Sequence, residues 1–165
     1  MKKITMLALM LAVVPMWAKG SSSGGSKKGS WDFGGSVGLT WVGNTPYPTI
    51  SAYATYNMLS YLDWTTEIEV IMHTTDSMDI SVPSTLKFYP LAGKQKIDPY
   101  FGPGVTYTRT YDGKDAFGGH AVIGVDFLFI KGAKFGIEGK LTYYLVPDKS
   151  YTWTVGPTGS WNIDF

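Results

Sequence analysis

Apolar and polar residues alternate with a period of two from Trp31 to the end of the chain. In 31–42, for example, Trp31, Val37 and Trp41 stand at odd positions, while glycine and small polar residues fill most even positions. Side chains of a β-strand point alternately to its two faces, so this period predicts strands and not helices. We expect eight strands, at 31–42, 47–58, 62–72, 78–89, 97–109, 116–129, 134–145 and 151–165.

Short turn segments separate these strands, and several contain turn residues such as Gly43-Asn44 and Asp112-Gly113. Short connections join neighbouring strands antiparallel. Each strand is long enough to cross a membrane at a tilt, which takes about 9–11 residues. Open sheet edges would leave backbone groups unpaired in lipid, so the sheet must close. The predicted fold is therefore all-β, an eight-stranded antiparallel up-and-down transmembrane β-barrel.

The residues of the polar face indicate which face lies outside. A soluble barrel of the lipocalin type also alternates, with apolar side chains inside. Here the polar face is mainly Gly, Ser, Thr and Asn, which suit the narrow interior of eight strands. Charged residues are only 16% of the chain, against about 25% in ordinary soluble domains. Aromatic residues near strand ends resemble an interfacial girdle: Trp31, Trp41, Trp64, Tyr107, Tyr143, Trp153 and Trp161. We therefore expect the apolar face to meet lipid.

The N-terminal segment has the pattern of an export signal. Lys2 and Lys3 precede an apolar run from Ile4 to Val14, and small residues such as Ala18 follow. We expect a signal peptide at 1–20, a flexible linker at 21–30 and the barrel domain at 31–165. The predicted location is the outer membrane of a Gram-negative cell, reached through the periplasm. An even number of strands puts both termini on the periplasmic side.

The composition argues against several kinds of site. The chain has no cysteine, so it has no disulfide or thiolate metal site, and its formal net charge is +1. No strip of basic and aromatic residues favours nucleic acid, and the two histidines lack the spacing of metal ligands. We expect no metal, no cofactor and no nucleic-acid partner.

Three segments resemble one known family. The chain ends in Trp161–Phe165, with alternating apolar residues before a terminal Phe. Asp98–Val105 resembles the Pro-Tyr-x-Gly-x-Gly strand of one family, and Phe135–Leu141 resembles the penultimate strand of the same family. The resemblance is to the small outer-membrane β-barrel domain family, which includes OmpA/OmpX-like barrels. It implies structural or adhesive roles, and it implies that Phe165 is the signal read by the barrel-assembly machinery. The short outer loops weaken the adhesin role, and Pro103 departs from the family, which usually has a small residue there.

Charged residues on the inward face form the main candidate site. They are Glu67, Glu69, Lys87, Asp126, Glu138 and Lys140. The short turns predict that Glu67 and Lys87 are diagonal neighbours on paired strands. They also predict that Asp126 lies nearly opposite Glu138, with Lys140 one step along. Buried charges must be paired, so we expect a network that plugs the lumen. A gated ion path through rearranging pairs is the alternative.

The histidines give a weak catalytic signal. His73 stands at a loop edge, and His120 points inward. Some eight-stranded outer-membrane barrels modify lipid A with a His, a Ser and an acid. A deacylase of that type has its Ser two residues after the His, where this chain has Val122. We expect the histidines to fill space in the structure or to lie at the surface, and the catalytic set to be empty.

Three prolines fall inside predicted strands, where each removes a hydrogen bond of the ladder: Pro83, Pro103 and Pro157. If the strands at 78–89 and 97–109 pair through the turn between them, Pro83 and Pro103 lie at nearly the same level. We expect either a local gap in the wall that admits a lipid tail, or a β-bulge.

The pattern as a whole favours a monomeric outer-membrane barrel with a plugged polar lumen, surrounded by lipid and without enzymatic activity. One alternative is a lipid-modifying enzyme on the same barrel, which needs a nucleophile near His120, such as an inward Ser or Thr. Another alternative is a soluble periplasmic barrel that binds an apolar ligand.

Overall fold

The computed structural model describes residues 28–74, 76–91, 96–130, 132–147 and 149–163. Its secondary structure in these ranges consists of eight β-strands. They are β1 (Trp31–Val42), β2 (Thr45–Leu59), β3 (Leu62–Met72), β4 (Met78–Phe88), β5 (Ile97–Arg109), β6 (Asp115–Ile130), β7 (Ala133–Val146) and β8 (Ser150–Ile163). No helix in the described part of the chain is long and apolar enough to cross a membrane.

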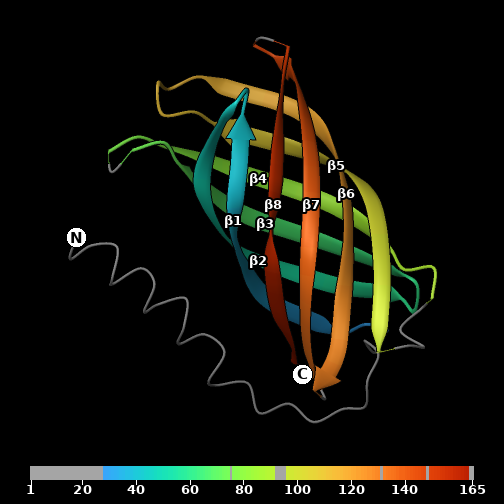
Figure 1. Ribbon diagram of the computed structural model, residues 1–165. Coiled ribbons are helices and arrows are strands. Elements are labelled where there is room, and N and C mark those ends of the chain that lie inside the picture. Colours follow the sequence, from blue (N-terminus) through green and yellow to red (C-terminus); the bar gives the residue numbers. More distant parts are fainter. Residues whose placement is uncertain (1–27, 75, 92–95, 131, 148, 164–165) are drawn as a thin grey trace.

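The eight strands form one closed sheet in the order β1 to β8, with every neighbouring pair antiparallel. Figure 1 shows β1 beside β8, and their pairing closes the ring from Trp31↔Ile163 to Val42↔Thr152. We call the end where β1 begins and β8 finishes the terminal end, and the other the opposite end. The predicted up-and-down barrel is confirmed.

The strand bounds follow the alternation closely. The bounds of β1, β3 and β5 are those predicted, whereas β2 begins two residues earlier, at Thr45. This extension contains Pro46 and Pro48, which pair with β1. Pairing of β2 with β3 starts only at Thr49, so the prolines lie where no β3 partner needs a backbone N–H.

The barrel has its apolar residues outside. Ile123, Val105 and Ile68 are 70%, 63% and 59% exposed, whereas the inward-facing Thr40 and Ser81 are fully buried. An exterior of this kind requires lipid, because a soluble surface would leave a very large apolar area in water. The predicted orientation of the faces is confirmed. The soluble ligand-binding barrel requires the reverse arrangement and is contradicted.

Inward glycines make room for large side chains in the lumen. A Cβ atom added to Gly124 would lie 2.4 Å from the ring of Tyr100, and one added to Gly34 would lie 2.6 Å from the ring of Tyr53. Eight strands enclose little space, so each tyrosine needs a wall residue without a side chain opposite it. These glycines therefore allow Tyr53 and Tyr100 to fill the lumen.

Candidate functional site: the charged lumen

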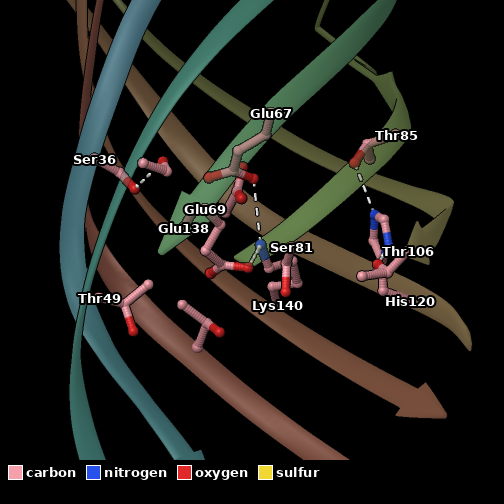
Figure 2. Close-up of polar contacts among 12 residues, drawn as sticks. Ser36, Thr49, Glu67, Glu69, Ser81, Thr85, Thr106, His120, Glu138 and Lys140 are labelled. Carbon is pink, nitrogen blue, oxygen red and sulfur yellow. Dashed lines mark hydrogen bonds and ion pairs between the residues drawn. The ribbon is translucent and has the colours of Figure 1, made fainter. Parts of the chain in front are cut away.

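Lys140 on β7 is the centre of the first charge cluster. Its Nζ lies 3.0 Å from Glu69 Oε2 and 3.2 Å from Glu67 Oε2 (Figure 2). The two glutamates are two residues apart on β3, so the strand period turns both carboxylates into the lumen. Both Lys140 and Glu69 are buried, and burial of charges is tolerated when they are paired in this way.

A second cluster is built around Glu138, which lies two residues before Lys140 on β7. Lys87 Nζ lies 2.5 Å from Glu138 Oε2, and the Tyr100 hydroxyl donates to the same oxygen over 2.7 Å. The Lys87 ammonium also lies 4.6 Å from the centroid of the Tyr100 ring, which is cation–π distance. Glu138 Oε2 therefore accepts hydrogen bonds from the Lys87 ammonium on β4 and from the Tyr100 hydroxyl on β5.

A third cluster lies at the terminal end. Lys134 Nζ is 2.6 Å from Asp32 Oδ2, and Asn162 Nδ2 donates to Asp32 Oδ1 over 2.5 Å. Asp126 accepts a hydrogen bond of 3.1 Å from the Tyr89 hydroxyl. This cluster joins β1, β7 and β8, and so ties together the seam that closes the barrel.

All six residues predicted for the network point into the lumen, but one predicted pairing is wrong. Glu67 and Lys87 are not diagonal neighbours, because Lys87 stands opposite Asp63. The hairpin between β3 and β4 pairs Met72 with Met78, and this register sets Glu67 four residues away from the level of Lys87. Lys87 instead binds Glu138, three strands away around the ring.

Asp126 was predicted to lie nearly opposite Glu138, and the structure places it on the neighbouring strand, one pair of residues along. Asp126 pairs with Gly136, and Glu138 pairs with Gly124, so the two carboxylates are diagonal neighbours on β6 and β7. Asp126 takes its hydrogen bond from Tyr89 and not from Lys140, which faces β3.

Four buried charged or ion-paired residues at the terminal end of the lumen were not among the predicted site residues. They are Asp32, Asp63, Asp98 and Lys134. All four lie on the inward face by the same period of two, so the alternation could have found them. They stand at the second position of their strands, where a side chain is more often solvated than buried.

His120 on β6 joins three strands. Its Nε2 lies 2.8 Å from Thr85 Oγ1 on β4, and its Nδ1 lies 2.6 Å from Thr106 Oγ1 on β5 (Figure 2). All three side chains are buried. A hydroxyl is therefore present beside the imidazole, although the position two residues further on is Val122.

His73 belongs to a separate cluster at the opposite end. Its Nε2 lies 2.8 Å from Asp79 Oδ2, and the Tyr111 backbone N–H donates to Asp79 Oδ1 over 2.8 Å. The ring of Tyr47 contacts the imidazole with centroids 4.2 Å apart. These contacts connect the turn at 110–114 to β2 and β4 over the mouth of the barrel.

The prolines do not lie at one level. Pro83 is buried and stands opposite Thr106 on β5, three residues from Pro103, which faces outward, so the predicted alignment is wrong. Ladder pairing of β4 and β5 lapses between Thr85↔Gly104 and Phe88↔Phe101 without a change of register.

The strands nevertheless remain close where this pairing lapses. A Cβ atom added to Gly102 would lie 1.8 Å from the Leu86 carbonyl oxygen. The β4 and β5 backbones therefore touch beside Pro103 and do not part there. Ladder pairing of β1 and β8 lapses in the same way beside Pro157, between Ser36↔Thr158 and Leu39↔Val155, and there too the backbones stay in contact, because a Cβ atom added to Gly38 would lie 2.6 Å from the Val155 carbonyl oxygen.

The lumen contains small cavities between the clusters. One of about 20 Å³ is lined by residues that include Tyr53, Tyr89 and Lys134, and one of about 10 Å³ lies beside Glu138 and Lys140. A water molecule needs about 10–15 Å³ measured in this way. These two cavities have room for single waters and not for an acyl chain.

Two further predictions concern metals and the chain ends. Among the described residues, no group of three or more His, Cys, Asp or Glu side chains is placed to hold a metal ion. The signal peptide at 1–20, most of the linker and the assembly signal Phe165 lie outside the described residues. Ser30, the last linker residue, accepts a hydrogen bond of 3.0 Å from Asn57 Nδ2.

Comparison with solved structures identifies the fold. The N-terminal β-barrel domain of OprF from Pseudomonas aeruginosa matches with a TM-score of 0.66 at 10% identity, covering 84% of this chain and 100% of that one. The outer membrane protein OprG from the same organism matches with a TM-score of 0.61 at 14% identity, covering 86% and 99%. The chain has the fold of the eight-stranded outer-membrane β-barrels.

A third match is to an enzyme. The outer membrane enzyme PagL has a TM-score of 0.51 at 14% identity, covering 81% of this chain and 99% of that one. No family model matches the sequence, and no curated protein matches it. The solved structures therefore show the fold of an outer-membrane barrel, and one protein with this fold is an enzyme.

Proposed function

We propose that this protein is a structural, non-catalytic barrel of the bacterial outer membrane, with a lumen closed by its own ion pairs. The observation that carries the proposal is the cluster of Lys140 with Glu67 and Glu69. It joins β7 to β3, which are opposite each other in an eight-stranded ring. A side-chain bridge across the full lumen favours a closed barrel.

The terminal-end cluster supports the same proposal. Asp32, Lys134 and Asn162 connect β1, β7 and β8 by short contacts, and the cavities described above hold no more than single waters. The protein is inserted as a monomer through its C-terminal strand by the barrel-assembly machinery, and its stable partners are lipids.

Conductance across a planar lipid bilayer tests the closed lumen. The purified wild-type barrel is expected to give no steady conductance, with a general-diffusion porin as the positive control. A steady open level in the wild-type protein would contradict the proposal. It would favour a gated ion path through the lumen pairs.

A lipid-modifying enzyme is the second candidate, favoured by the 2.8 Å approach of Thr85 Oγ1 to His120 Nε2. A nucleophile and base at this distance resemble a catalytic pair. However, the second imidazole nitrogen faces the Thr106 hydroxyl and not an acid, and both threonines are buried. We infer that the three residues have a structural role and hold β4, β5 and β6 together.

Mass spectrometry of lipids separates the two candidates. Wild-type protein is incubated in vesicles of phospholipid and lipopolysaccharide, and no deacylated or acylated product is expected. A product that disappears in both Thr85→Val and His120→Ala, while folding is retained, would establish the enzyme.

A further inference from the structure

Asp63 is a buried acid near the terminal end of the lumen. It is the second residue of β3 and is 4% exposed. Its partners in the sheet are Asn57 on β2 and Lys87 on β4, each directly opposite it. Directly opposed residues have Cβ atoms about 4.5–5.5 Å apart, so Asp63 is within reach of both side chains.

The charged groups that act electrostatically on Asp63 come from four other strands. They are Lys87 on β4, Lys134 on β7, Asp32 on β1 and Asp126 on β6. Both lysines are committed to other carboxylates. Lys87 Nζ is 2.5 Å from Glu138, and Lys134 Nζ is 2.6 Å from Asp32. An ionised Asp63 would therefore be a buried anion near two others, without a lysine of its own, which is a costly arrangement.

Asn57, which stands opposite Asp63, lacks a hydrogen-bond donor for its amide oxygen within the described part of the chain. It is fully buried, and its Nδ2 donates to Ser30 O over 3.1 Å and to Ser30 Oγ over 3.0 Å. A backbone carbonyl can only accept, so this contact fixes the orientation of the amide. The Asn57 Oδ1 atom then remains as an acceptor that has no hydrogen-bond partner among the described residues.

From this geometry we propose that Asp63 is a proton-binding site: its carboxyl group keeps a proton at neutral pH and donates it in a hydrogen bond to Asn57 Oδ1. The proton comes from water when the barrel folds. One bound proton removes the unmatched charge and also satisfies the buried amide oxygen, so two costs disappear together.

The proposal predicts that replacing aspartate by asparagine changes the melting temperature differently at Asp63 and at Asp32. Asp63→Asn resembles the protonated acid, since its amide can donate to Asn57, and it should melt no lower than wild type at neutral pH. It should melt higher at alkaline pH, where the wild-type acid is forced to ionise. The matched control Asp32→Asn loses the Lys134 ion pair and should melt lower by about 5 °C or more.

Infrared spectroscopy detects the proton directly and does not depend on a variant. Wild-type barrel with carbon-13-labelled aspartate, in heavy water at neutral pH, should show the C=O band of a protonated carboxyl group, and Asp63→Asn should lack this band. Absence of the band in wild type would overturn the proposal. So would a loss of stability in Asp63→Asn equal to that of Asp32→Asn, or wild-type stability that depends on a particular metal cation.

Discussion

Lys140 Nζ and Glu69 Oε2 lie 3.0 Å apart although the residues are 71 positions apart in the sequence and stand on opposite walls of the barrel. In a soluble protein the centre of a domain is filled by apolar side chains. Here the apolar side chains face the lipid, so polar side chains fill the centre. These polar groups must form hydrogen bonds and ion pairs with one another. The ion pairs are therefore the core of this molecule.

Substitution of Lys140 tests this view of the core. Lys140→Met leaves two glutamates buried without their lysine, so we expect the free energy of unfolding to fall by about 3–5 kcal/mol. The change is measured by unfolding the protein in urea and using the heat-dependent mobility of its band in SDS gels to follow the folded fraction. Lys149→Met, at an exposed turn position, is the matched control and should be neutral.

Removing the unpaired charges should restore stability. The triple variant Lys140→Met, Glu67→Gln, Glu69→Gln is expected to regain most of the loss, because an uncharged cluster does not leave an isolated buried ion. If Lys140→Met unfolds like wild type, the cluster does not stabilise the core.

The lipid-facing surface is tested by a charge at its most exposed point. Ile123 is 70% exposed on β6, and Ile123→Lys should cost about 2–4 kcal/mol, since the lysine would face the hydrocarbon. Tyr111→Lys is the control, because Tyr111 is 63% exposed but lies in a turn at the opposite end. Equal and small effects of both substitutions, measured in vesicles, would show that Ile123 faces water.

The strands and their faces could be predicted because they depend only on local order. Ile68 and Glu69 are neighbours in the sequence, yet one is 59% exposed and the other 3%. A period of two predicts this contrast without knowledge of any partner strand. The same period placed all six predicted lumen charges on the inward face.

The pairings could not be predicted because they depend on register and on the width of the barrel. Lys87 was expected beside Glu67, but the hairpin register sets it opposite Asp63. Its partner, Glu138, is on a strand that is not adjacent, so no turn length relates the two residues. Contacts across a lumen depend on the stagger of the whole sheet.

Gly102 tests the close approach of β4 and β5 beside Pro103. Gly102→Ala would bring a Cβ atom to 1.8 Å from the Leu86 carbonyl oxygen, so backbone must move, at a cost of about 1–3 kcal/mol or more. The control is Gly139→Ala, whose nearest contact would be 3.8 Å away and which should change stability by less than about 1 kcal/mol. Urea unfolding compares them, and a neutral Gly102→Ala would mean that the two strands lie further apart.

The turn at 110–114 makes a prediction for acid pH. Lys114 Nζ lies 2.8 Å from Asp112 Oδ2, and Thr110 Oγ1 donates to Asp112 Oδ1 over 2.5 Å. These contacts, with Lys114 first, lower the pKa of Asp112 from 3.8 to about 2. A carboxylate with a lowered pKa stabilises the folded turn above its unfolded pKa, and this contribution is lost as the pH falls through about 2.

Carboxyl carbon chemical shifts measured by NMR in detergent micelles follow this titration. In Lys114→Gln the Asp112 midpoint should rise toward 3.8, whereas Lys149→Gln, in another turn, should leave it unchanged. High salt should raise the wild-type midpoint as well, because the pair is exposed and screened. The melting temperature of the barrel should hardly change in Lys114→Gln, since exposed ion pairs add little stability. A midpoint that does not respond to Lys114→Gln would mean that the ion pair does not form in solution.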